Sequence, residues 1–191
     1  MNNVPVPISE EEQLEINKNI VENLKKYKGT SILKKAAMNV LVKHLAASQV
    51  KDLQKEFESI DKDLSGFLEL DELVQAIKKA NVDMKEEEIK QIVKEVDYAE
   101  NGRVNYSEFI AATINTKNFL SEQKLMAIFQ SFDLDDTGFI TINNLKDSFS
   151  KFGRDLTDHE IEQIMAAHDT DKDRSIDFQE FKLMMTGEKT M

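Results

Sequence analysis

The chain has 191 residues with a formal net charge of −11, six glycines, two prolines and no cysteine. The absence of cysteine excludes disulfides, thiol catalysis and zinc–thiolate sites, and it agrees with a reducing compartment, for which we expect the cytoplasm. The acidic balance argues against a nucleic-acid partner, and no apolar run approaches the roughly 20 residues of a membrane-spanning helix.

The first 47 residues predict a tail and two helices. Residues 1–8 predict a disordered tail, and Ser9 with Glu12 forms a candidate capping box that opens the first helix. That helix ends at Lys28-Gly29-Thr30, or continues if Gly29 is only a kink. Two interpretations stay open for it: a solvated amphipathic helix, or a segment that blocks an active site.

The second helix is predicted over residues 31–45 (SILKKAAMNVLVKHL), with Lys35, Asn39 and Lys43 on one narrow polar strip. Most of the remaining circumference is apolar, which is too much for a helix that hides one side only. The apolar positions are Ile32, Leu33, Ala36, Ala37, Val40, Leu41 and Leu45. The segment is either the first core helix of an ordinary bundle or a basic amphipathic helix that lobes of the same chain clasp. We favour the second.

Charge separates the two N-terminal helices, called the leader below (residues 9–47), from the rest of the chain. Residues 23–51 contain seven lysines and no acidic residue, whereas residues 52–191 contain 31 acidic and 17 basic residues. A basic arm therefore precedes an acidic body, whose charge suits cations and cationic helices.

The body repeats a twelve-residue pattern every 36 residues, starting at Asp61, Asp97, Asp133 and Asp169. Oxygen-bearing side chains recur at alternating positions, which is how a short loop curls around Ca²⁺ with ligands at positions 1, 3, 5, 7, 9 and 12. Phe67, Arg103 and Phe139 are predicted to bind through their backbone carbonyls. The predicted ligands are Asp61, Asp63, Ser65, Phe67, Glu69 and Glu72 in loop one, and Asp97, Asn101, Arg103, Asn105 and Glu108 in loop two. They are Asp133, Asp135, Thr137, Phe139 and Thr141 in loop three, and Asp169, Asp171, Asp173, Ser175, Asp177 and Glu180 in loop four.

The four loops are not equivalent. Loops one and four carry the most ligand carboxylates and are predicted to bind Ca²⁺ most strongly, although Arg174 replaces the expected glycine and must adopt a left-handed conformation. Loop two has Ala99 at position 3 and should bind more weakly. Loop three ends in Asn144, which cannot supply a bidentate carboxylate, so this loop either holds Ca²⁺ loosely or is mainly structural.

Apolar residues flank each loop at helical spacing and predict two helices per loop, with part of the packed face becoming a groove in a sensor. The apolar residue at position 8 predicts a short two-stranded contact between paired loops; these residues are Leu68, Val104, Ile140 and Ile176. Helix starts are predicted from Asp83 with Glu86, from Ser121, and from Thr157 with Glu160. The predicted fold is all-α: junction helices at 9–47, one lobe of two loops at 48–116 and a second at 117–191.

These loops resemble EF-hands. With the leader (ENLKKYKG, then LKKAAMNVLVKHLA) placed directly before QVKDLQKEFESID, residues 20–186 resemble the C-terminal regulatory part of calcium-dependent protein kinases of plants and apicomplexan parasites. The resemblance implies an autoinhibitory junction, a calmodulin-like Ca²⁺-binding domain and an attached serine/threonine kinase domain as partner. Ala99, Asn144 and Arg174 depart from the family pattern.

The chain has no kinase catalytic motif, so we expect a regulatory segment rather than an enzyme. The resemblance implies that Ca²⁺ relieves autoinhibition of the attached kinase. A free-standing Ca²⁺ sensor that binds another protein's helix is the alternative, and a Ca²⁺ buffer is a third. Exchange of lobes between two chains is also left open.

Overall fold

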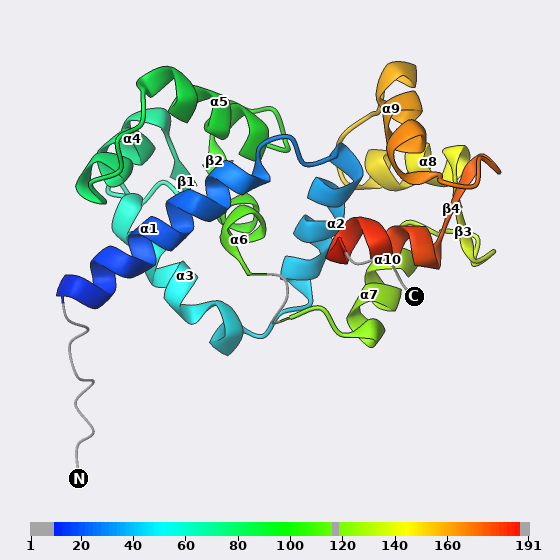
Figure 1. Cartoon of the computed structure of the whole chain (residues 1–191), viewed down its shortest axis with the longest axis horizontal. Coiled ribbons are helices and arrows are strands. Elements are labelled where there is room, and N and C mark those ends of the chain that lie inside the picture. Colours follow the sequence, from blue (N-terminus) through cyan, green and yellow to red (C-terminus); the bar gives the residue numbers. More distant parts are fainter. Residues whose placement is uncertain (1–9, 116–118, 188–191) are drawn as a thin grey trace, which may run out of the picture.

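The computed structural model describes residues 10–115 and 119–187, which form two groups of helices with two short antiparallel sheets (Figure 1). The predicted tail 1–8 and the predicted cap Ser9 lie outside the described residues. The leader forms α1 (Glu10–Tyr27) and α2 (Ile32–Lys43). The first group contains α3 (Ala47–Ile60), β1 (Phe67–Leu68), α4 (Leu70–Lys79), α5 (Glu86–Val96), β2 (Val104–Asn105) and α6 (Tyr106–Thr113). The second contains α7 (Glu122–Gln130), β3 (Phe139–Thr141), α8 (Ile142–Lys151), α9 (Asp158–His168), β4 (Ser175–Asp177) and α10 (Phe178–Thr186).

The loops join in pairs through these sheets. Leu68 lies opposite Val104 in β1–β2, and Ile140 lies opposite Ile176 in β3–β4. All four side chains are buried. The pairing predicted from the apolar residue at position 8 is therefore confirmed.

Each pair of loops sits on an aromatic core made by the flanking helices. The Phe57 ring packs edge-to-face with Tyr106 and Phe109 at centroid distances of 5.5 and 5.6 Å, and Phe129 packs in the same way with Phe178 and Phe181 at 5.6 and 5.5 Å. Such edge-to-face contacts add to the free energy gained by burying the rings. The apolar stripes thus form core, as their spacing predicts.

Of the three predicted helix starts that fall on described residues, two are confirmed. The Ser121 hydroxyl accepts from the Lys124 amide, and Thr157 and Glu160 cap each other's amides at the start of α9. The start predicted at Asp83 is wrong, because α5 begins at Glu86 after Lys85. There the Glu88 carboxylate accepts from the Lys85 amide at 3.2 Å, and three glutamates in the first turn suit the positive end of the helix dipole.

Gly29 separates the two leader helices. Its φ of +77° turns the chain out of α1, and the Thr30 amide donates to the Tyr27 carbonyl at 3.1 Å. A glycine adopts this left-handed conformation without steric cost. The leader is therefore two helices with a turn between them, and not one kinked helix.

Helix α1 packs against α5 and α6 of the first group, where Ile20, Val21 and Leu24 are buried. The Asn23 amide also donates to the Thr113 carbonyl at the end of α6 at 2.7 Å. The described part of α1 is thus attached to the body along one face.

Helix α2 lies between the two groups of helices and contacts α6 on one side and α7 and α9 on the other (Figure 1). Its buried residues are Leu33, Ala36, Ala37, Met38, Val40 and Leu41. On the predicted polar strip, Lys35 pairs with Glu95 of α5, and the Lys43 ammonium lies 5.9 Å from the Phe152 ring centroid. The strip therefore contacts both groups instead of facing solvent alone.

Candidate metal centre

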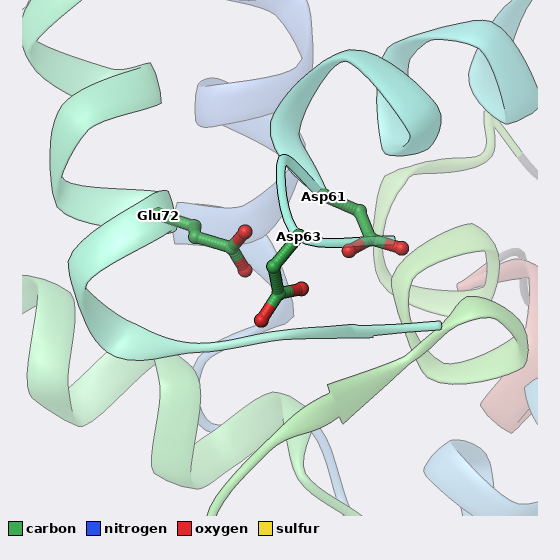
Figure 2. Close-up of side chains that lie close together, drawn as sticks. All are labelled: Asp61, Asp63 and Glu72. Atoms are coloured by element: carbon green, nitrogen blue, oxygen red, sulfur yellow. The ribbon is translucent and has the colours of Figure 1, made fainter. Parts of the chain in front are cut away.

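Loop one brings three carboxylates together. One oxygen from each of Asp61, Asp63 and Glu72 lies within 4.8 Å of the others (Figure 2). The sharp turn at Gly66, with φ of +80°, lets the Gly66 amide donate to Asp61 at 2.9 Å. Three carboxylate oxygens converging on one point are what a hard divalent cation binds.

The remaining predicted ligands of loop one differ in their position relative to this cluster. The Ser65 hydroxyl donates to the Phe67 carbonyl at 3.1 Å, so the two oxygens at positions 5 and 7 are adjacent. The hydroxyl of Ser65 also lowers the pKa of Asp63, and this favours the charged carboxylate. Glu69 lies outside the cluster of carboxylates and precedes α4 as an exposed residue.

Loop four makes a second cluster from Asp169, Asp171 and Glu180, again with oxygens within 4.8 Å of one another. The Oδ1 atom of Asp169 is buried and has no hydrogen-bond partner. A buried, unpaired carboxylate oxygen is costly unless a cation or water satisfies it, so these residues fit Ca²⁺. The amide of Asp173 lowers the pKa of Asp171, but partial desolvation and the charges of neighbouring carboxylates raise it overall.

Other residues of loop four shape the turn. Arg174 adopts the predicted left-handed conformation with φ of +69°, and its amide donates to Asp169 at 3.0 Å. Asp173 accepts from both the amide and the hydroxyl of Ser175, and Asp177 caps α10. These two carboxylates therefore already have donors within the loop.

Loop two has the same backbone frame with fewer charges. Asp97 accepts from the amides of Asn101 and Gly102 at 3.0 and 2.6 Å. Glu108 is 2% exposed, and it accepts from Ala99 and Asn105 at 2.9 and 2.8 Å. Burial raises the pKa of Glu108, while the backbone donors lower it in part. Only two of the predicted ligands here are carboxylates.

The side chains at positions 5 and 7 of loop two also have partners. The Asn101 side chain accepts from the Arg103 amide at 3.0 Å. The guanidinium of Arg103, whose carbonyl is the predicted ligand, lies 4.5 Å from the ring centroid of Phe67 in loop one. The contact between Arg103 and Phe67 therefore ties loop two to loop one.

Loop three is closed by its own side chains. The Asn144 carboxamide oxygen accepts from the amide of Thr141 at 3.0 Å, so its Nδ2 faces the other way and donates to Asp135 at 3.2 Å. In the other loops the residue at position 12 is a glutamate, whose second oxygen accepts from an amide near the loop entry: Lys62, Ala99 or Thr170. Asn144 thus places a donor where the other loops have an acceptor.

The rest of loop three keeps the common frame. Asp133 accepts from the amides of Thr137 and Gly138 at 3.1 and 2.8 Å. The Thr137 hydroxyl lies 3.2 Å from Asp135 and 3.3 Å from the Phe139 carbonyl. The sequence identifies Asn144 as a missing carboxylate, but its bond to Asp135 became visible only in the structure.

His168, the last residue of α9, makes a specific contact with the leader. Its Nε2 lies 2.7 Å from the hydroxyl of Ser31, which caps α2 by accepting from Lys34. Burial lowers the pKa of His168, as does the positive charge of Lys34, while Glu180 opposes them. This contact joins the start of α2 to the residue before loop four, and no local motif in the sequence signals it.

Four helix–loop–helix units joined in antiparallel pairs, with converging carboxylates in two loops, define a calcium-binding protein. The pattern of the EF-hand domain pair matches residues 50–114 and 122–186. The chain belongs to the EF-hand family.

Proteins similar to this chain include calcium-dependent protein kinase 17 of Arabidopsis thaliana, 33% identical over 166 residues that cover 87% of this chain and 31% of that protein. Calcium-dependent protein kinase 11 of Oryza sativa subsp. japonica is 32% identical over 173 residues, covering 90% and 30%. The chain thus spans about a third of the length of these relatives. A crystal structure of the C-terminal domain of PF110239 aligns over 88% of this chain and 97% of that chain, with a TM-score of 0.45 and 24% identity. No helix in the described residues is long and apolar enough to cross a membrane.

Proposed function

We propose that this chain is the calcium-sensing regulatory segment of a cytoplasmic serine/threonine protein kinase, and that Ca²⁺ binding relieves autoinhibition of the kinase. Residues 9–47 would form the inhibitory junction, and residues 48–116 and 117–191 the two sensing lobes. The observation that carries the proposal is the position of α2. Six of its residues are buried, and it contacts helices of both pairs of hands, so a rearrangement of either pair changes its surroundings.

The described loops differ in the charge they can offer to Ca²⁺. Loops one and four have clustered carboxylates and should bind most strongly; loop two has two carboxylate ligands and should bind less strongly. In loop three, the Asn144 amide contacts Asp135, so we infer that this loop is mainly structural. The residues that would hold Ca²⁺ are the ligands named above for loops one, two and four.

Bound Ca²⁺ would supply the positive charge that draws the carboxylates of a loop together. Glu72 and Glu180 link the beginning of each loop to the helix that leaves it, since each accepts from an amide at the loop entry and stands in the first turn of α4 or α10. A change in their orientation therefore moves the exit helix relative to the entry helix. The contact of His168 with Ser31 gives loop four a direct connection to α2.

The test compares the wild type with the double variant Glu72→Gln/Glu180→Gln and with Asp71→Asn, a carboxylate-to-amide change at a neighbouring residue outside the predicted ligand set. Calorimetry should show at least two Ca²⁺ sites in the wild type and in Asp71→Asn, and loss of the tight sites in the double variant. A Ca²⁺-induced structural change that survives in the double variant contradicts the proposal.

The kinase part is tested by adding the whole chain to the separate kinase domain of a calcium-dependent relative. Phosphorylation of a peptide should be inhibited without Ca²⁺ and released with it, and the double variant should inhibit in both conditions. No effect on the kinase, together with Ca²⁺-dependent binding of a helical peptide from another protein, would favour the free-standing sensor.

A further inference from the structure

A side chain of the second pair of hands reaches calcium loop two of the first pair. Arg154 follows α8, and its Nη1 donates to the Tyr98 carbonyl at 3.1 Å. Its Nη2 lies 2.7 Å from a carboxylate oxygen of Glu100 and 2.8 Å from one of Glu160. The Arg154 side chain is 18% exposed, so it is largely withdrawn from solvent in this position.

The same contact includes aromatic packing across the two pairs. The Arg154 guanidinium lies 5.4 Å from the centroid of the Tyr98 ring, and that ring is 6.2 Å from the ring of Phe149 in α8. Tyr98 is 8% exposed, although it belongs to a loop. Three kinds of interaction therefore hold the second pair against loop two: a hydrogen bond to the backbone, an ion pair and ring packing.

These contacts leave the predicted metal ligands free. Tyr98 and Glu100 occupy positions 2 and 4 of loop two, whereas ligands come from positions 1, 3, 5, 7, 9 and 12. Arg154 thus contacts loop two beside the predicted Ca²⁺ site, without contacting the ligands.

The charge of Arg154 has a consequence for this loop in particular. A guanidinium beside a loop with two carboxylate ligands repels a dication, and it also neutralises Glu100, an acidic residue of the same loop. A nearby charge changes the Ca²⁺ affinity of a loop most when few of the ligands in that loop carry charge. Glu160 belongs to the same pair of hands as Arg154, so the contacts of Arg154 that cross between the two pairs are those with Glu100 and Tyr98.

We propose that Arg154 couples the docking of the second pair of hands to calcium binding at loop two, and that the two processes oppose each other. Docked Arg154 weakens Ca²⁺ binding at loop two, and because coupling is reciprocal, Ca²⁺ bound there weakens docking by the same factor. The Ca²⁺ occupancy of loop two therefore depends on the arrangement of the two pairs as well as on the Ca²⁺ concentration. This inference rests on Ca²⁺ binding at loop two, as in the proposed function.

The test follows each loop separately by NMR. Glycine-selective ¹⁵N labelling of a chain with six glycines gives separate signals for Gly66, Gly102 and Gly138, whose amides donate to the first aspartate of loops one, two and three. In Arg154→Gln, the Ca²⁺ concentration that half-shifts Gly102 should fall on the order of threefold, as expected for one partly screened charge near a dication. Lys146→Gln is the matched control, because Lys146 pairs with Asp158 inside the second pair of hands. Its Gly102 titration should match the wild type.

A second readout measures docking. Because the chain has no cysteine, Lys78 and Glu162, exposed on α4 and α9, can be changed to cysteine and labelled with a fluorescent pair. Arg154→Gln should lower energy transfer in Ca²⁺-free buffer, and Arg154→Lys, which keeps the charge, should restore most of the wild-type Ca²⁺ dependence at Gly102.

The outcomes separate this inference from the proposed function. A Gly102 signal that titrates at the same or a higher Ca²⁺ concentration in Arg154→Gln than in the wild type overturns the coupling alone. A Gly102 signal that no Ca²⁺ concentration shifts in the wild type overturns Ca²⁺ binding at loop two, and with it the coupling. Calcium-induced shifts of Gly66 in the same spectra show whether the sensing function survives.

Discussion

Replacement of Leu41 by alanine tests whether α2 is packed between the two pairs of hands. Leu41 has 0% exposure in α2, and the helix contacts α6, α7 and α9. Since alanine is at least as good a helix former as leucine, the substitution should not weaken α2 itself. Any loss of stability therefore reports the packing around the removed atoms.

The expected loss is about 3 kcal/mol in the free energy of unfolding, within the roughly 2–5 kcal/mol measured when a buried leucine becomes alanine. In a chain of this length, that corresponds to a decrease in Tm of roughly 6–12 °C. Urea unfolding followed by far-UV circular dichroism, and calorimetry for Tm, both in Ca²⁺-free buffer, provide the measurement.

The matched control is Leu64→Ala, which removes the same atoms from a side chain that is 81% exposed. Its effect should stay within about 0.5 kcal/mol, as for most surface substitutions. If Leu41→Ala costs less than about 1 kcal/mol, or no more than Leu64→Ala, Leu41 is not held in a packed interface and the mechanism built on α2 fails.

Three further substitutions test the loops and the leader. Asn144→Glu should add a Ca²⁺-binding event in calorimetry, whereas the exposed neighbour change Asn143→Glu should not; an unchanged stoichiometry in Asn144→Glu would refute our account of loop three. Arg174→Gly should raise the free energy of unfolding by up to about 1 kcal/mol in urea, because φ of +69° strains any residue with a Cβ, and a loss of stability would contradict this. Lys35→Gln should speed chymotrypsin cleavage after Tyr27, because Lys35 lies over the Tyr27 ring and pairs with Glu95; an unchanged rate would show that these contacts do not hold the leader.

The local features were predictable from the sequence because local chemistry causes them. Gly66 and Arg174 had to accept a left-handed backbone at position 6, and both do. The apolar residues at position 8, such as Ile140 and Ile176, had to meet across paired loops, and they do. Asp83 was a wrong helix start because α5 begins after Lys85, whose amide donates to the carboxylate of Glu88.

By itself, the sequence determined four calcium-type loops, their unequal ligand sets and a basic helical leader, because each depends on residues close together in the chain. It also determined the pairing of the loops, because the apolar residue at position 8 recurs every 36 residues. Tertiary structure alone decided what lies against these elements. It placed α2 between the two pairs, brought His168 to Ser31 and set Arg154 on loop two. Contacts between residues as far apart as 56 and 137 positions leave no periodic signal in a single chain, since they depend on how separately folded helices dock.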